Sequence, residues 1–349
     1  MARSDRSGDI ILSTRNVTKR YGQVEAVREL TLEIRDGEFF TIVGPSGSGK
    51  STLIRMLGGL EAPTTGSVWL RDEDITHVPA NRRPTCMVFQ SLALFRHRSV
   101  GENIEFAQKM RGVPPGERRR HALEMMRIVR LPDSYYNRRI HQCSGGEQQR
   151  VALARALASD PTILFFDEPL SAIDYRLRKI LEVEMKDLHR RTGKTFVYIT
   201  HSLEEAMVMS DRISIMRDGN IVQTGTPRDI YSRPGSRFVA QFMGEVNVFE
   251  IREGRIASPE ADVSAIGRHG YLVLRPEHLR RLDGQDAADV RFEAIVESEY
   301  MLGSRLQYHL RAGDASLVAE IPIPAATGVT PGITARWGFD LADATLTED

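Results

Sequence analysis

The run of residues from Gly44 to Thr52 constrains the fold of this chain more than any other feature. It reads GPSGSGKST and directly follows Phe39 to Val43, a short apolar run that is typical of a buried strand. The run fits the pattern G-x-x-x-x-G-K-[S/T], which forms a phosphate-binding loop between a strand and a helix. The residues that this pattern predicts around a phosphate are Gly44, Pro45, Ser46, Gly47, Ser48, Gly49, Lys50, Ser51 and Thr52.

The chemistry of phosphate binding explains the spacing within this loop. Gly47 and Gly49 let the backbone wrap closely, so that successive N–H groups point at a phosphate, and the helix that begins near Lys50 adds its positive end. Lys50 supplies a charge to the β- and γ-phosphates of a nucleotide, and the Ser51 hydroxyl is suited to hold Mg²⁺. The loop predicts a nucleotide-binding α/β protein with a largely parallel sheet.

A second apolar run, Thr162 to Phe166, predicts a strand that is buried on both faces. It is followed at once by two carboxylates, Asp167 and Glu168. We expect Asp167 to help hold Mg²⁺ and Glu168 to polarise the water that attacks the γ-phosphate. Together the two runs predict nucleotide triphosphate hydrolysis.

Four further segments narrow the class of protein. Val88 to Gln90 ends a strand-like run with an amide, and Phe196 to Thr200 is another strand-like run that leads to His201. Ser171 to Asp174 closely follows the carboxylate pair. The sequence SGGE from Ser144 to Glu147 precedes a helix rich in Ala and Leu, and it fits the S-x-x-E pattern of a helix capping box.

In this order the segments resemble the ATP-binding subunit of an ATP-binding cassette (ABC) transporter, from about Leu12 to Asn247. The resemblance implies a P-loop NTPase core with a helical subdomain at about residues 91–157, and ATP and Mg²⁺ as substrate and cofactor. It implies that Tyr21 stacks on adenine. It also implies that Gln90, Glu168 and His201 are catalytic, with Ser51, Gln90 and Asp167 as Mg²⁺ ligands.

The chain has a single phosphate-binding loop and a single segment, Ser144, Gly145, Gly146 and Glu147, that resembles the family signature. In the family, the signature closes over ATP that a partner subunit holds. The resemblance therefore implies a head-to-tail dimer of two copies, with Asp174 as the aspartate of the family's D-loop. Cys143 and Glu147 depart from the family's usual leucine and glutamine, and their effect is left open.

The net charge of the chain and its pattern of apolar and polar residues both change near Gly244. Residues 246–349 carry 10 Arg, no Lys and 17 acidic residues, a net charge of −7, whereas the first 245 residues carry +7. Six short alternating segments punctuated by turns predict a small all-β barrel in this tail. The predicted strands are Val248 to Ile251, Tyr271 to Leu274, Val290 to Val296, Arg305 to Leu310, Ser316 to Ile323 and Thr334 to Phe339. We therefore expect two domains, residues 1–244 and 245–349.

The tail resembles the transport-associated OB-like domain of importer-type ATPase subunits. The residues that carry this resemblance are Leu274 to Glu277 and Tyr300 to Gly303. The resemblance implies an ATPase that drives a binding-protein-dependent importer. The junction Gly244 to Asn247 favours polyamine- or ferric-iron-type subunits, and sulfate, phosphonate, thiamine and sugar importers stay open. Two functions of a different kind also stay open: a soluble ABC ATPase acting on nucleic acid or the ribosome, and a tail that binds a regulatory small molecule.

Several features bear on partners and location. The whole chain is electrically neutral, with 47 basic and 47 acidic residues, and the acidic tail disfavours a nucleic-acid partner. Cys86 and Cys143 are too few for a disulfide framework, and the N-terminal residues have no apolar stretch like that of a signal peptide. We expect a peripheral protein on the cytoplasmic face of the inner membrane, bound to transmembrane permease subunits. The expected docking residues are Leu94, Phe95, Arg96 and Arg98.

Overall fold

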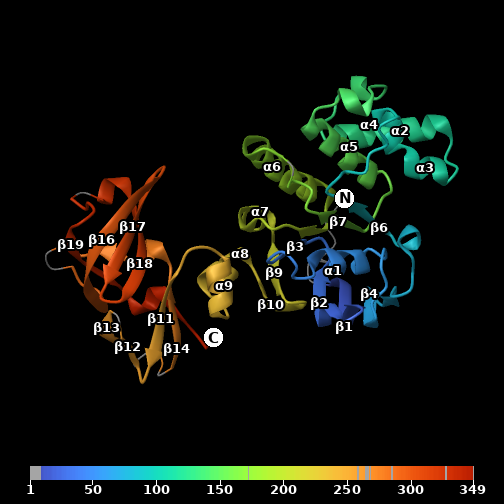
Figure 1. Cartoon of the computed structure of the whole chain (residues 1–349). Helices are drawn as coiled ribbons and strands as arrows, with labels where there is room; N and C mark the ends of the chain where they lie inside the picture. Colours follow the sequence, from blue (N-terminus) through green and yellow to red (C-terminus); the bar gives the residue numbers. More distant parts are fainter. Residues whose placement is uncertain are drawn as a thin grey trace. The chain divides into compact units, whose positions relative to one another are not determined.

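The computed structural model describes residues 9–171, 173–257, 259–263, 267, 269–283, 286–326 and 328–348. The chain forms two compact units, Met1–Pro227 and Arg228–Asp349, which we call the first and second unit (Figure 1). Within the described ranges, no helix combines the length and the apolar character that crossing a membrane requires.

A mixed sheet of order β10-β9-β3-β8-β7-β6 forms the centre of the first unit. Its neighbours from β9 to β6 pair in parallel, and β10 joins the edge antiparallel. All residues of β3 are buried, as expected for a central parallel strand. The strands are β3 (Phe39–Val43), β6 (Thr85–Val88), β7 (Ile163–Asp167), β8 (Thr195–Ile199), β9 (Arg212–Arg217) and β10 (Asn220–Gly225).

The two faces of this sheet belong to two different cores, because successive side chains of a strand point to opposite faces. Phe165 and Val197 pack in one core with α1 (Lys50–Leu57) and an antiparallel sheet of order β2-β1-β4-β5. Phe166 and Tyr198 pack in the other core, among helices. The antiparallel strands are β1 (Ile10–Tyr21), β2 (Val24–Arg35), β4 (Thr65–Leu70) and β5 (Glu73–Asp74).

Apart from α1, the helices of the first unit come from two parts of the chain. Between residues 91 and 157, the structure has α2 (Val100–Ile104), α3 (Phe106–Met110), α4 (Pro115–Ile128) and α5 (Gly145–Leu157), which gather in one group in Figure 1. Two further helices, α6 (Tyr175–Thr192) and α7 (Leu203–Met209), follow β7 and β8. Helix α4 begins at Pro115, because proline suits the first turn of a helix.

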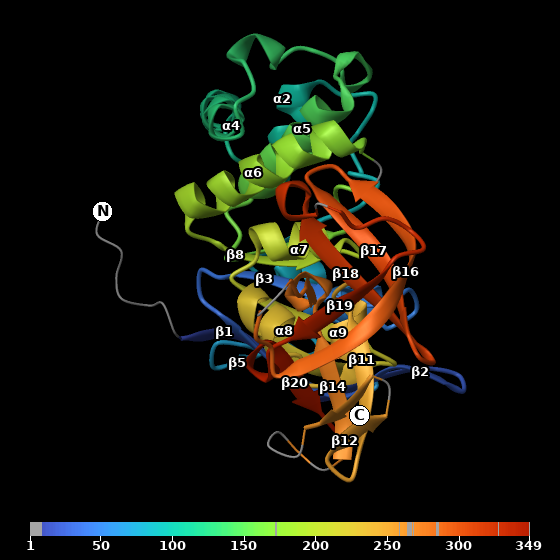
Figure 2. The ribbon, with the colours of Figure 1, turned by 90° about the vertical axis from the view of Figure 1, so that its left-hand side faces the viewer.

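The second unit begins with two short helices, α8 (Pro227–Ser232) at its boundary and α9 (Arg237–Phe242), and continues as strands. These form two antiparallel sheets, of order β13-β12-β11-β14-β20 and β15-β19-β16-β17-β18, around one apolar core. Figure 2 shows the long, curved strand β16, which pairs with β17 and β19. The strands are β11 (Asn247–Arg252), β12 (Arg255–Ala257), β13 (Glu260–Asp262), β14 (His269–Leu274), β15 (Arg280–Arg281), β16 (Val290–Leu302), β17 (Arg305–Ala312), β18 (Ala315–Pro322), β19 (Thr334–Phe339) and β20 (Ala344–Thr347).

All six strands predicted for the tail are present, as β11, β14, β16, β17, β18 and β19. The prediction missed β12, β13, β15 and β20. These strands have between two and four residues, too few for alternation to be recognised.

The division of the chain differs from the expected boundary near Gly244, because residues 228–244 lie in the second unit. The guanidinium of Arg275, which is 6% exposed, holds these residues. It donates hydrogen bonds to the carbonyl oxygens of Tyr231 (3.3 Å), Ala240 (3.0 Å) and Glu245 (3.2 Å). These contacts join α8 and α9 to the start of the β-rich part, although their own sequence is helical and lacks the tail's alternation.

Candidate functional site

The loop between β3 and α1 can form only with glycine at key positions. Gly49, the residue before α1, has φ of 101°, and a Cβ atom there would lie 2.2 Å from the carbonyl oxygen of Ala26. A Cβ atom on Gly44 would lie 2.1 Å from the carbonyl oxygen of Met216. The loop therefore lies directly on neighbouring backbone. Its residues line a hollow of about 410 Å³.

This hollow collects residues from four parts of the sequence. It is lined by Ala26, Ser46, Gly47, Gly49, Lys50, Ser51, Thr52, Glu168 and His201. The sequence predicted all of these except Ala26, which lies on β2 and carries no chemical signal. We call this cavity the P-loop hollow.

Lys50 is buried in the wall of the P-loop hollow, with 6% of its surface exposed. Its Nζ donates to the carbonyl oxygens of Gly44 (2.9 Å) and Pro45 (2.8 Å). Burial lowers the pKa of this ammonium group, and the charges of Glu168 and Asp167 oppose that effect. The loop thus holds a desolvated cation against its own backbone, where an anionic ligand would stabilise it.

Ser51, which lines the hollow, lies beside Asp167, which does not. The Ser51 Oγ lies 3.5 Å from a carboxylate oxygen of Asp167, at the end of β7. Burial raises the pKa of the Asp167 carboxyl, Arg55 opposes that effect, and the neighbouring charge of Glu168 adds to it. A hydroxyl and a carboxylate are ligands that fit Mg²⁺, which protein sites bind through one or two carboxylates and substrate phosphates.

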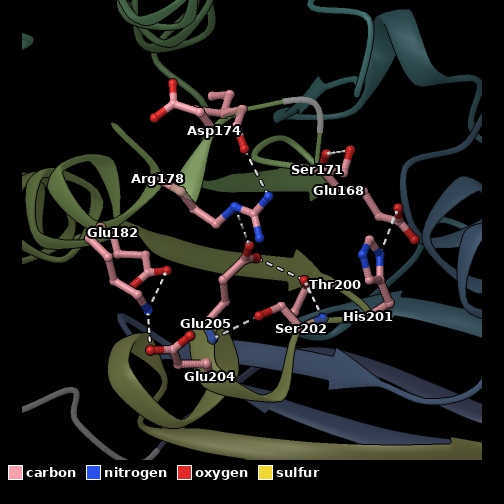
Figure 3. A network of polar contacts seen from close by, with 12 residues as sticks. Glu168, Ser171, Asp174, Arg178, Glu182, Thr200, His201, Ser202, Glu204 and Glu205 are labelled. Atoms are coloured by element: carbon pink, nitrogen blue, oxygen red, sulfur yellow. Dashed lines mark hydrogen bonds and ion pairs between the residues drawn. The ribbon is translucent and has the colours of Figure 1, made fainter. Parts of the chain in front are cut away.

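Glu168 and His201 form a pair at the ends of the adjacent strands β7 and β8. The His201 Nδ1 lies 3.1 Å from a Glu168 carboxylate oxygen (Figure 3). Glu168 has φ of 47°, in the left-handed region that non-glycine residues rarely adopt, and its N–H donates to the Ile199 carbonyl at 3.0 Å. Such backbone strain is concentrated at functional sites. It turns Glu168 away from the strand direction and toward His201.

Gln90, after β6, is attached to the same loop through Ser171. Its Nε2 donates to the Ser171 hydroxyl at 3.0 Å, and that hydroxyl donates to the Glu168 carbonyl at 2.9 Å. The structure therefore brings Gln90 to the backbone of Glu168, while its expected role as a Mg²⁺ ligand stays a prediction. The sequence predicted no role for Ser171, although its position three residues after Glu168 was the available signal.

The SGGE segment and Asp174 are helix caps in this structure. Ser144 precedes α5 and forms the predicted capping box, because its N–H donates to the Glu147 carboxylate (2.7 Å) and its Oγ accepts from the Glu147 N–H (3.3 Å). Tyr135 also donates to the Glu147 carboxylate, at 3.0 Å, and Arg138 lies 3.7 Å from it. These contacts lower the pKa of Glu147, with the Ser144 N–H as the largest cause.

Asp174 caps α6 by accepting a hydrogen bond from the Leu177 N–H at 3.0 Å. Neither Asp174 nor the four residues Ser144 to Glu147 are among those that line the P-loop hollow within the described chain.

Tyr21 also lies outside the residues that line the P-loop hollow. Tyr21 is 48% exposed, its ring lies below the Lys19 ammonium group, and its hydroxyl donates a hydrogen bond to Glu61. Stacking of Tyr21 on adenine therefore stays a prediction.

Comparison with known proteins gives the class that this fold and site define. The sequence profile of the ABC transporter family matches residues 27–171, and that of the TOBE domain matches residues 272–346. A dimeric bacterial ABC transporter cassette aligns with a TM-score of 0.56 and 34% identity, over 62% of this chain and 99% of that chain. An ATP-binding cassette bound to ADP and Pi in a post-hydrolysis state aligns with a TM-score of 0.55 and 33% identity, over the same shares.

Full-length relatives narrow the class. The spermidine/putrescine import ATP-binding protein PotA of Roseobacter denitrificans is 44% identical over 319 residues, 86% of this chain and 87% of that protein. The protein of the same name from Methylococcus capsulatus is 47% identical over 305 residues, 83% of this chain and 79% of that protein. The chain belongs to the ABC transporter ATP-binding proteins. Within them it is an import-type ATPase with a C-terminal TOBE domain, as predicted from the sequence.

Proposed function

We propose that this chain hydrolyses ATP to drive polyamine uptake, with Glu168 polarising the attacking water. The observation that carries the hydrolytic part is the P-loop hollow, in which Lys50, Ser51, Glu168 and His201 meet. The loop N–H groups and the Lys50 ammonium bind the phosphates. Positioned donors of this kind stabilise charge on the phosphoryl group in the transition state.

When bound, Mg²⁺ would neutralise part of the negative charge of the nucleotide's phosphates. Ser51 and Asp167 would hold it, and Gln90 would reach it after exchanging its bond to Ser171. The chain's own residues position the attacking water. Glu168 accepts a hydrogen bond from the attacking water, and His201 fixes the Glu168 carboxylate from its other side. In this arrangement the strained backbone of Glu168 keeps its carboxylate at the edge of the hollow.

We infer that the complete site needs a second copy of the chain. Ser144 to Glu147 begin helix α5, whose first-turn N–H groups suit a γ-phosphate, but these residues are not in the lining of the chain's own P-loop hollow. A head-to-tail dimer brings this helix end to ATP in the partner. The dimeric cassette among the similar structures supports this assembly.

The names of the relatives support a proposal for the transported substrate and the remaining partners. Both curated relatives are named for spermidine and putrescine import, and they match most of this chain. We propose that this chain docks on transmembrane permease subunits at the cytoplasmic face of the inner membrane, and that a substrate-binding protein delivers the polyamine. Arg96, exposed after β6, belongs to the docking surface.

The test measures ATP hydrolysis by the complex of this chain with its cognate permease subunits and binding protein in lipid vesicles. Spermidine or putrescine should stimulate hydrolysis and accumulate in the vesicles, and neither should occur with Lys50→Ala. Ferric iron, sulfate and thiamine serve as competing substrates. Stimulation by one of these, with none by a polyamine, would contradict the substrate assignment and leave the hydrolytic assignment intact.

A further inference from the structure

A buried carboxylate on α7, Glu205, anchors the backbone around His201. Glu205 is 2% exposed, and one of its carboxylate oxygens accepts hydrogen bonds from the Tyr198 hydroxyl and the Thr200 hydroxyl, both at 2.8 Å. The proximity of Glu205 adds to the effect of burial, which is the main reason why the pKa of Tyr198 is well above its usual value. A buried charge with this many partners defines the local geometry closely.

The residues on both sides of His201 are bonded into this anchor (Figure 3). The Thr200 hydroxyl accepts from the Ser202 N–H at 2.9 Å while it donates to Glu205. The Ser202 Oγ accepts in turn from the Glu205 N–H at 3.3 Å. The backbone that carries the His201 imidazole is therefore fixed to Glu205 from either side.

Arg178 on α6 connects the same carboxylate to the loop that follows Glu168. Its Nη2 donates to the Ile173 carbonyl oxygen at 2.8 Å, beside Asp174, the cap of α6. Its Nε lies 3.8 Å from the second carboxylate oxygen of Glu205. Figure 3 shows Arg178 between Asp174 and Glu205. The arginine thus spans from the loop to the anchor.

In the Arg178–Glu205 pair, the Glu205 side chain is 3% exposed and the Arg178 side chain 26% exposed, and the contact between them is longer than a hydrogen bond. In the described part of the chain, the buried Nε of Arg178 has no hydrogen-bond partner. A hydrogen bond needs a separation of about 2.9 Å, so 3.8 Å leaves the bond unmade. A small shift of α6 and its leading loop would make it. A buried donor without a partner costs free energy. Formation of the hydrogen bond between Arg178 Nε and Glu205 therefore favours the shifted position of α6 and its leading loop.

We propose that Arg178 and Glu205 are positioning residues that couple the loop at Ile173 and Asp174 to His201. When that loop moves against a partner subunit, the pair shortens and the backbone around His201 is held in place for Glu168. This inference rests on the roles proposed above for Glu168 and His201. Neither Arg178 nor Glu205 lines the P-loop hollow among the described residues, so their effect is on turnover rather than on ATP binding.

A neighbouring ion pair provides a matched control. Lys179 and Glu204 also join α6 to α7, with Nζ 2.5 Å from a Glu204 carboxylate oxygen. Glu204 precedes Glu205 directly, but its side chain is 57% exposed. Glu204→Gln therefore removes the same charge from the same helix and breaks a contact between the same two helices.

The decisive variant is Arg178→Lys in the full-length chain. Lysine keeps a positive charge opposite Glu205 but lacks the second donor that reaches Ile173. We expect kcat for ATP hydrolysis to fall about ten- to hundredfold, as displacement of a catalytic group does, with KM for ATP unchanged. Glu205→Gln should have the same effect, and the double variant should be no slower than either single variant, because both break one connection. Glu204→Gln should keep wild-type kcat.

Three results would overturn the proposal or part of it. A wild-type kcat for Arg178→Lys would mean that the pair only clamps two helices, whatever its effect on thermal unfolding. An equal loss of kcat in Glu204→Gln would mean that any contact between α6 and α7 matters. If Glu205→Gln fails to fold, Arg178→Lys carries the test alone. Glu168→Gln is measured alongside to separate the coupling from the proposed function. If Glu168→Gln remains active, the proposed roles of the site residues are wrong. If Glu168→Gln is inactive while Arg178→Lys and Glu205→Gln keep wild-type kcat, only the coupling proposal fails.

Discussion

The imidazole Nδ1 of His201 lies 3.1 Å from the carboxylate of Glu168, although 33 positions separate the two residues in the chain. They meet because β7 and β8 are adjacent and parallel, so that the ends of both strands open on the same edge of the sheet. The carboxylate can accept this bond only from a protonated Nδ1, which fixes the imidazole tautomer in the neutral ring.

This pair predicts the behaviour of His201→Ala. We expect kcat for ATP hydrolysis to fall about 100-fold or more, because Glu168 loses the partner that orients it. Binding of ATP should be nearly unchanged, since Lys50 and the loop N–H groups are intact. Steady-state kinetics together with binding of a fluorescent ATP analogue measure the two effects separately. A raised KM with normal kcat would instead place His201 in substrate binding.

The half-buried Asp167 carboxylate predicts that one substitution will raise stability and lower activity. Because burial raises its pKa in the folded state, the ionised carboxylate at neutral pH opposes folding of the nucleotide-free protein. Asp167→Asn should therefore raise the melting temperature at pH 7 while reducing Mg²⁺-dependent hydrolysis. The gain should shrink as the pH falls through the raised folded-state pKa and vanish below about 3.9, the usual value for an unfolded aspartate.

Calorimetry of the nucleotide-free protein at several pH values checks this prediction. Asp160 provides the comparison, because hydrogen bonding to Lys194 lowers its pKa. Asp160→Asn should lower the melting temperature at pH 7, an effect lost as the pH falls through the lowered folded-state pKa. If both variants change stability in the same direction at pH 7, the account of the Asp167 charge is wrong.

The capping carboxylate of Glu147 predicts a salt-dependent change in dimerisation. A carboxylate at this helix end stabilises α5 by about 0.3–1 kcal/mol, but it repels a γ-phosphate brought to the same end. Glu147→Gln should cost little stability, because glutamine can form the same capping box. It should strengthen the ATP-bound dimer at low salt, where screening is weak.

Dissociation constants of the dimer at two salt concentrations, in a Glu168→Gln background, test this effect. Arg138, 3.7 Å from the Glu147 carboxylate, partly neutralises it, so Arg138→Gln should weaken the dimer under the same conditions. Equal dissociation constants with and without Glu147→Gln at low salt would show that this carboxylate does not oppose ATP.

The expected docking residues differ from one another in their exposure to solvent. Arg96 is exposed, whereas Leu94, Phe95 and Arg98 are half-buried, and the Arg98 guanidinium lies 5.5 Å from the Phe95 ring centre. Arg96→Ala should keep the ATPase activity of the isolated chain and lose its stimulation by the permease. Arg98→Ala should also cost about 0.5–1 kcal/mol of stability, measured by urea unfolding. Loss of activity in isolated Arg96→Ala would argue against docking.

The sequence was sufficient for the parts of the site that depend on local patterns. The loop from Gly44 to Thr52 needs particular residue types at fixed spacing, and the buried strands before Asp167 and His201 read as continuous apolar runs. The order of the strands in the sheet is not given by local sequence patterns. Parallel strands nevertheless end at the same edge of the sheet, so the residues that follow them are expected to lie close together. The P-loop hollow could therefore be predicted almost completely.

What the sequence did not reveal depends on packing between distant segments. Residues 228–244 join the second unit because Arg275 bonds to their carbonyl groups, and nothing in their own composition indicates this. The link from Gln90 through Ser171 and the connection from Arg178 to Glu205 use ordinary residue types. Their partners become visible only when β7, β8 and α6 are assembled.

The role of Glu168 is the central claim, and the Glu168→Gln variant tests it most directly. ATP hydrolysis by this variant should be measured beside Glu204→Gln, which makes the same chemical change on an exposed side chain. We predict that Glu168→Gln binds MgATP as the parent does, forms a stable ATP-bound dimer in size-exclusion chromatography, and hydrolyses ATP at least about 100-fold more slowly. Turnover close to that of the parent, with no ATP-stabilised dimer, would contradict the account.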